Sequence, residues 1–393
     1  MRAITWFFWI AFAGSCCLFW WLESALLRLW LGVADPIQTR YLWISAASLL
    51  VFTVGYLLPA PRFPGLRTPA AVLDGCEKFS YVAAIVLAIP AFCVAIQFAV
   101  YRLGVSYLEG HGPSLLQQAV LYTHLFFGLM YVGVVRDERS NLRRIALVTF
   151  LTICPRLIVA LRWRRFFLAQ AVLPIVFIAI ARGWFKLDPK RLAGLGLIAL
   201  FILIIPALTR GDKMFGKDEL GRPQIVTYFG WMTTLNYLQN DSDLRHSCPP
   251  LFVSLTAKLI PYRALGLCTI DVGNETGLPA TIDRLLTKKY TNDIMKGTGG
   301  NYLLELYLTG GYSAMALGTI IFGFSYRRLV ELVDHPSAYA GIWAECLSRA
   351  LLVPRGSLGY VFERVPSLLL ATFAVIVVWR SFSRFRRQGS AAL

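Results

Sequence analysis

Long apolar runs separated by short polar segments are the main pattern along this chain. A helix needs about 20 mainly apolar residues to cross the hydrocarbon core of a membrane, with a range of about 17–25. Backbone groups within lipid must be bonded inside their own segment, so such runs predict a helical bundle. We expect ten spans, at residues 4–22, 41–59, 81–101, 116–134, 144–160, 167–181, 193–208, 301–324, 338–353 and 365–379.

The expected fold class is an all-α polytopic membrane protein. Alternation over about ten residues, which is typical of outer-membrane barrel strands, is absent from the sequence. The first run is rich in Trp and has no small-residue cleavage site, so we expect a retained helix rather than a removed signal peptide. The runs 144–160 and 167–181 are short and form either two spans or a buried hairpin.

One polar segment of about 90 residues, 209–300, interrupts this pattern. Its apolar pieces 229–238 and 251–260 are too short to span and suit interfacial or domain-core helices. Loops longer than about 15 residues are usually functional. We therefore divide the chain into an N-terminal bundle of about seven helices (1–208), a loop or lid (209–300), and about three helices with a basic tail (301–393).

Composition and charge narrow the class and orient the chain. Hydrophobic residues make up 57% of the sequence and charged residues 16%, whereas soluble chains carry about 25% charged residues. These values exclude a soluble globular enzyme, a disordered chain and a collagen-like rod. The net charge is +17. With both termini inside, 18 Lys and Arg flank the inner ends of the spans and seven lie in short outer loops. The positive-inside rule then places 209–300 outside.

Cysteine and histidine spacing gives no support to a metal site. No Cys-x-x-Cys, His-x3-His or Asp-rich calcium loop is present, and we expect no metal and no cofactor. Only Cys248 and Cys268 fall in the outer loop, where they form either a disulfide or two separate buried thiols.

Six arginines lie in outer turns or near the outer ends of spans, against the usual charge bias. Arginine offers a permanently charged planar fork that matches phosphate oxygens. Ionisable groups at membrane depth also mark functional sites. The alternative is that these residues bind lipid head groups or pair with Glu345 and Glu363. We expect a phosphate or diphosphate site formed by Arg162, Arg164, Arg165, Arg210, Arg349 and Arg355.

A Gly-rich segment, GTGGNYLLELYLTGGY at 297–312, enters the eighth span. Glu305 falls about one turn inside it, where a carboxylate is costly unless it is paired or functional. Such a group could take a proton from a hydroxyl, or it could be a purely structural partner of an arginine. His246 in the outer loop is the second candidate, because imidazole titrates near neutrality, although its neighbours are those of an ordinary loop.

The layout of spans, the long outer loop and the segment 297–312 together resemble the Wzy-type O-antigen polymerases. These proteins assemble the oligosaccharide repeat units of bacterial surface glycans. Some members carry an Arg-x10-Gly pattern in outer loops, and Arg210 to Gly221 matches one copy of it. The family's pattern is paired, and this chain has no second copy.

The resemblance implies a GT-C-like, metal-independent glycosyltransferase in the bacterial inner membrane, with its active site facing the periplasm. A glycan on undecaprenyl diphosphate would be moved en bloc to a repeat unit on the same lipid. Arginines would stabilise the leaving diphosphate in place of a metal. The expected protein partners are a flippase and a chain-length regulator. Glu305 would be the base or acceptor-orienting carboxylate, and three aromatic residues would stack on sugars or pack in the core: Tyr302, Tyr307 and Trp231.

Two other functions stay open from the sequence. An O-antigen ligase would use the same donor, pass the glycan to lipid A-core and depend on an outer-loop histidine. A transporter of the lipid-linked sugar would have internal repeats and broken helices near the middle of the membrane. The sequence pattern indicates neither repeats nor broken helices.

Overall fold

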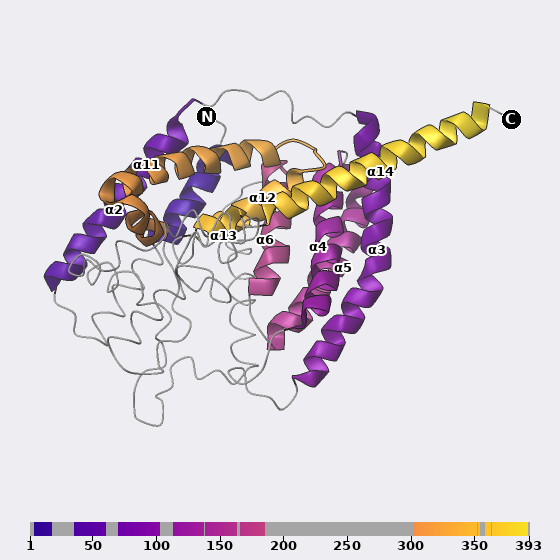
Figure 1. The fold of residues 1–393 in the computed structure, drawn as a ribbon, viewed down its shortest axis with the longest axis horizontal. Coiled ribbons are helices and arrows are strands. Elements are labelled where there is room, and N and C mark those ends of the chain that lie inside the picture. The colour runs from indigo at the N-terminus through magenta and orange to yellow at the C-terminus, as the bar shows by residue number, and fades with distance from the viewer. Residues whose placement is uncertain are drawn as a thin grey trace, which may run out of the picture. The chain divides into compact units, whose positions relative to one another are not determined.

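The computed structural model is all-helical in the residues it describes (Figure 1). The chain divides into two compact units. Unit 1 comprises 1–61, 213–328 and 349–364, and unit 2 comprises 62–212, 329–348 and 365–393. The predicted outer loop and the run 193–208 lie outside the described residues. The described residues are 4–17, 35–59, 70–102, 113–136, 138–162, 166–184, 302–351, 353, 358–362 and 364–391.

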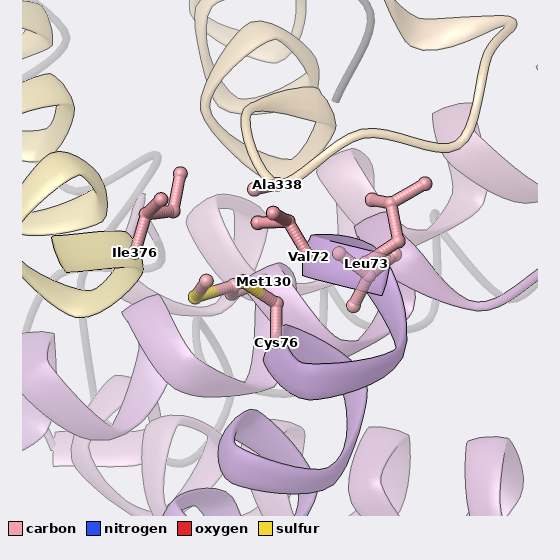
Figure 2. Packing of buried hydrophobic residues seen from close by; sticks show 7 residues of the cluster. Val72, Leu73, Cys76, Met130, Ala338 and Ile376 are labelled. Atoms are coloured by element: carbon pink, nitrogen blue, oxygen red, sulfur yellow. The ribbon is translucent and has the colours of Figure 1, made fainter. Parts of the chain in front are cut away.

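Four successive helices pack against one another in unit 2. They are α3 (Ala70–Tyr101), α4 (Leu115–Val134), α5 (Glu138–Arg162) and α6 (Phe166–Ala181). One core cluster joins α3 and α4 to α14 (Val365–Ala391) through Cys76, Met130 and Ile376 (Figure 2). The apolar runs therefore predicted these helices correctly, because each buries one face against its neighbours.

Three described helices are long and apolar enough to cross a membrane, namely Val72–Tyr101, Leu115–Val134 and Asn141–Leu161. Four shorter apolar helices accompany them, at Ile4–Cys17, Trp43–Leu57, Leu168–Ala181 and Val365–Ser381. The all-helical membrane class is confirmed at this level. The count of ten spans stays a prediction.

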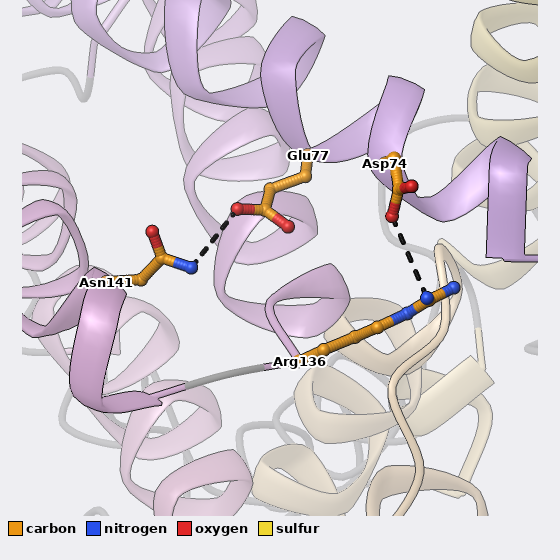
Figure 3. Close-up of polar contacts among 4 residues, drawn as sticks. All are labelled: Asp74, Glu77, Arg136 and Asn141. Carbon is orange, nitrogen blue, oxygen red and sulfur yellow. Dashed lines mark hydrogen bonds and ion pairs between the residues drawn. The ribbon is translucent and has the colours of Figure 1, made fainter.

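Helix α3 begins eleven residues before the apolar run expected at 81–101, and two charged residues of this extension have polar partners on other elements. Arg136, just after α4, lies 3.7 Å from the carboxylate of Asp74. Asn141 on α5 donates a hydrogen bond of 3.4 Å to Glu77 (Figure 3). The first turns of α3 are thus also in contact with the ends of two other elements, while Val72, Leu73 and Cys76 of the same turns are buried in the core cluster.

Two arginines bind the carbonyl groups at the ends of other helices. Arg182, just after α6, donates to the carbonyls of Val132 (3.0 Å) and Val135 (2.8 Å) at the end of α4. In unit 1, Arg327 donates to the carbonyls of Tyr56 (3.1 Å) and Leu57 (3.3 Å) at the end of α2 (Asp35–Leu57). Helix C-termini leave such carbonyls without intrahelical partners and carry partial negative charge. Both arginines therefore stabilise a helix end.

Unit 1 is held together by close packing of helix Ile4–Cys17, α2 and α11 (Tyr302–Val333). The Phe12 and Phe52 rings stack with centroids 4.1 Å apart, and Phe322 lies 5.6 Å from Phe12. A Cβ atom at Gly323 of α11 would collide with the backbone carbonyl of Phe52. Glycine at this position allows α2 and α11 to approach backbone to backbone.

The Gly323→Ala variant should be less stable by about 1–3 kcal/mol, because the added methyl overpacks a rigid backbone contact. Thermal unfolding of the purified protein in detergent measures this loss. Gly14→Ala is the matched control, since nothing lies within 4 Å of a Cβ there and alanine favours the helix. Equal unfolding temperatures for the two variants would contradict the packing.

Candidate functional site

Glu305, on the first turn of α11, is fully buried, with 0% of its surface exposed. Its Oε2 accepts a hydrogen bond of 2.7 Å from the backbone N–H of Leu358. Leu358 is the first residue of α13 (Leu358–Phe362), where backbone N–H groups have no partner within the helix. The carboxylate therefore joins the start of α11 to the start of α13 within unit 1.

Helix α11 is broken at Gly310 and Gly311. Gly310 has φ −172° and ψ 34°, and Gly311 has φ 68° and ψ −154°. The second pair of angles is open essentially only to glycine. The apolar run 301–324 therefore does not form one continuous helix, and our interpretation that no helix is broken was wrong. Two adjacent glycines are a weak signal of such a break, because glycine is common in membrane helices.

The two parts of α11, 302–309 and 312–333, fold back on each other. The side chain of Leu306 packs against Gly318, so closely that a Cβ atom at Gly318 would collide with it. The rings of Tyr302 and Phe322 lie 5.6 Å apart. In a straight helix, 12 residues would separate the first pair by about 18 Å along the axis, and 20 residues would separate the second by about 30 Å. The segment is thus a helical hairpin, and we call 302–322 the α11 hairpin.

Two tyrosines flank the break at the tip of the α11 hairpin. Tyr307 and Tyr312 form an edge-to-face pair, with centroids 5.1 Å apart and planes at 70°. Tyr307 is partly buried, whereas Tyr312 is 47% exposed. Tyr302, in contrast, is fully buried against Phe322. Of the two predicted sugar-binding tyrosines, only Tyr307 lies where a ligand could reach it in this conformation.

Arg349 lies in the last turn of α12 (Ala340–Ala350) and is 2% exposed. Glu345 is also buried and lies one turn earlier on the same helix. Cations are favoured near a helix C-terminus. The predicted diphosphate-binding role of Arg349 stays a prediction, and it requires a substrate group to reach a residue that is covered in this conformation.

Most of the predicted site residues lie outside the described part of the chain, so their roles stay predictions. Arg162 ends α5, but its side chain is not described. In the sequence, Arg355 precedes Leu358 by three positions. The site residues outside the described part are Arg164, Arg165, Arg210, Arg355, His246 and Trp231.

A buried polar network in unit 2 was assigned no role by the sequence. Arg156, in the middle of α5, is 1% exposed. It donates to the carbonyl of Leu121 (2.9 Å) and to Oε1 of Gln170 (3.3 Å). The guanidinium carbon also lies 4.6 Å from the ring centroid of Tyr122. The position of an arginine inside the apolar run ICPRLIVAL was the signal that could have revealed this network.

Two polar residues of α4, His124 and Tyr122, lie next to Leu121, whose carbonyl Arg156 binds, or close to it in the chain. His124 on α4 is buried, and its Nε2 has no hydrogen-bond partner among the described residues. The hydroxyl of Tyr122 donates to the same Gln170 oxygen at 3.3 Å. The network thus connects α4, α5 and α6 through hydrogen bonds of arginine, glutamine and tyrosine.

No group of three or more His, Cys, Asp or Glu in the described ranges could hold a metal ion.

Comparison with known proteins identifies a similar family. The family model of O-antigen polysaccharide polymerase Wzy matches residues 278–386. The resemblance predicted from the sequence is thereby confirmed for this part of the chain. The matched range contains Glu305, the α11 hairpin, α12 and α13. No curated protein and no solved structure was found to match the chain.

Replacing Glu305 by alanine should lower the free energy of unfolding by about 1–3 kcal/mol, because it leaves the buried N–H of Leu358 without its acceptor. Glu305→Gln keeps an amide oxygen at that place and should lose less. Thermal unfolding in detergent compares the two variants, with Ser313→Ala at an exposed position of α11 as the control. An alanine variant as stable as this control would contradict the role of the hydrogen bond.

Proposed function

We propose that this chain, which resembles O-antigen polymerases over residues 278–386, polymerises lipid-linked oligosaccharide repeat units into a surface polysaccharide. The family match carries the proposal. One feature of the structure supports it, since the matched range includes a buried carboxylate. The three apolar helices of unit 2 suit an enzyme whose substrates are anchored in a membrane.

The proposed donor is a glycan on undecaprenyl diphosphate, and the acceptor is one repeat unit on the same lipid. A bond forms between the anomeric carbon of the donor and a hydroxyl oxygen of the acceptor's non-reducing sugar. The bond from that carbon to the diphosphate breaks, and undecaprenyl diphosphate leaves with its electron pair. The acceptor hydroxyl gives its proton to a base. We place this transfer at the periplasmic face of the bacterial inner membrane.

Glu305 is our choice for the base. The hydrogen bond from Leu358 fixes one of its oxygens, and a base must be held within hydrogen-bond reach of the hydroxyl that it deprotonates. Glu305 is covered in this conformation, so this role requires the acceptor hydroxyl to gain access to its other oxygen. Its position five residues before the break puts it within about 7.5 Å along the helix axis of the tip of the α11 hairpin. His246 is the second candidate for this role.

Arginines are proposed to hold the diphosphate and to stabilise the negative charge that develops as it leaves. Arg355 is the first candidate, because it lies three positions before Leu358, which Glu305 binds. Arg210 is the second, and Arg349 and the cluster Arg162, Arg164 and Arg165 complete the proposed set. This chemistry uses no metal. A flippase would supply the substrate, and a chain-length regulator would act with the enzyme.

One observation favours a second function, transport of the lipid-linked sugar. Broken helices often form the substrate site of secondary transporters, and α11 is broken. A transporter would move the repeat unit across the membrane and make no glycosidic bond. The fate of the repeat units therefore distinguishes transport from polymerisation.

Deletion of the gene should leave a surface glycan of a single repeat unit, and the wild-type gene should restore the ladder of longer chains on a gel. Glu305→Gln should fold but fail to restore the ladder, because an amide cannot take the proton. The stability of this variant, measured as above, separates lost chemistry from lost folding.

Other outcomes of the deletion identify other functions. Accumulation of lipid-linked repeat units in the cytoplasm would indicate a transporter, and polymer that is not joined to lipid A-core would indicate a ligase. A ladder restored by Glu305→Gln and abolished by His246→Ala would refute Glu305 as the base and favour the ligase.

Removing Arg355 should reduce transfer by about 100-fold, the usual effect of losing one charged or hydrogen-bonding group that stabilises a transition state. Transfer kinetics of the purified enzyme with lipid-linked repeat units measure this loss. Arg355→Lys should recover activity only in part, since lysine keeps the charge but lacks the fork. Arg380→Ala, at an exposed position of α14, is the control. Unchanged transfer by both Arg355→Ala and Arg210→Ala would refute the diphosphate site.

A further inference from the structure

The break in α11 brings together two tyrosines that a continuous helix would keep apart. Residues five apart lie about 140° from each other around a helix, so Tyr307 and Tyr312 would point to different faces. In the α11 hairpin their rings are in contact, with centroids 5.1 Å apart. The Gly-only conformation of Gly311 is what permits this pairing.

The tip that carries the pair is accessible. Tyr312 is 47% exposed, and its neighbours Gly310 and Ser313 are also exposed. The base of the α11 hairpin is buried, as Tyr302, Leu303 and Leu306 show. The hairpin therefore has an apolar base fixed inside unit 1 and a tip that a ligand can reach.

The backbone at the tip departs from helical geometry at Gly310 and Gly311. Helix ends leave carbonyl and N–H groups without intrahelical partners, so an interruption of this kind offers a ligand backbone hydrogen-bonding groups. The hydroxyl of Thr309 donates to the carbonyl of Glu305 at 2.8 Å, the usual bond of a helical threonine to the carbonyl four residues earlier. Irregular backbone at membrane depth occurs where it is buried in protein or lines a polar cavity.

This combination matches the chemistry of a sugar. A pyranose ring presents C–H faces that suit aromatic rings and a rim of hydroxyls that suits backbone groups and carboxylates. Binding sites of this kind combine aromatic surfaces with a few fixed polar groups. The tip offers an aromatic pair, and the carboxylate of Glu305 follows about one and a half turns down the hairpin.

We propose that Tyr312, paired with Tyr307 at the tip of the α11 hairpin, forms a sugar-binding subsite for the glycan of the lipid-linked repeat unit. This inference rests on the proposed function, because it places the sugar beside Glu305. Tyr312 is the residue that it adds, and Gly311 sets the geometry. An exposed tyrosine that only anchors the chain at the membrane interface is the competing role that the experiment must separate.

The probe is the single-repeat oligosaccharide released by mild acid from the lipid-linked glycan of the deletion strain. Its binding to the wild-type protein in detergent is followed by NMR titration. Tyr312→Ala and Tyr307→Ala should each weaken binding by about tenfold. Tyr312→Phe keeps the ring and should bind like the wild type. Tyr101→Ala is the control, because Tyr101 is 67% exposed at the end of α3 in unit 2.

Gly311→Ala gives an independent test of the hairpin geometry. Nothing lies within 4 Å of a Cβ at this position, so any effect comes from the backbone conformation and not from a collision. The variant should lose binding as Tyr312→Ala does. Binding at the wild-type level would overturn the part of the proposal that assigns the geometry to Gly311.

The failure of this inference differs from the failure of the proposed function. If the wild type makes a ladder while Tyr312→Ala matches Tyr101→Ala in binding and in ladder length, the subsite is refuted and the polymerase stands. If the oligosaccharide binds through Tyr312 and no ladder forms, the subsite stands and the polymerase is refuted. A Tyr312→Ala variant that loses only stability in lipid nanodiscs would reduce Tyr312 to a membrane anchor and overturn the subsite.

Discussion

Backbone polar groups that lie away from water must find partners inside the protein, and the described structure depends on this constraint. Charged side chains supply such partners at three helix ends. Arg182 and Arg327 bind terminal carbonyls of α4 and α2, and Glu305 binds the first N–H of α13. Within a helix, Arg156 binds the carbonyl of Leu121. In each case a charge that would be costly in lipid is placed on a backbone group of opposite partial charge.

This use of charge changes the meaning of the basic surplus. Arg182 and Arg327 are two of the 18 basic residues that the sequence pattern places at the inner ends of the spans, where they would set orientation. The structure gives the same residues a second role, because a helix C-terminus attracts a cation wherever it lies. A residue that caps a helix carries information about folding and little about chemistry.

The sequence predicted helices well where burial follows length and apolarity, as in α4, α5 and α6. It failed where tertiary contacts decide. The first turns of α3 bury Val72, Leu73 and Cys76 against residues of other elements, among them Met130 and Ile376. The α11 hairpin depends on a contact between Leu306 and Gly318, which no local pattern encodes. It was predictable that Glu305 would have a polar partner or a function, since an unpaired carboxylate in an apolar run is costly. Its partner Leu358 was not, because a backbone N–H has no signature in sequence.

The break in α11 explains how one short segment can serve both the fold and the proposed chemistry. In a straight helix that buries Tyr302 and Leu306, Tyr312 would lie about 15 Å from Tyr302 along the helix axis. The ring of Tyr312 would also point to another face of the helix. Folding the helix back lets the buried residues hold the segment in place while the tip stays exposed. Glu305 lies between these two regions, anchored by Leu358 and close to the tip. The carboxylate is therefore held in the protein interior about one and a half turns from an exposed tip, an arrangement that a straight buried helix would not give.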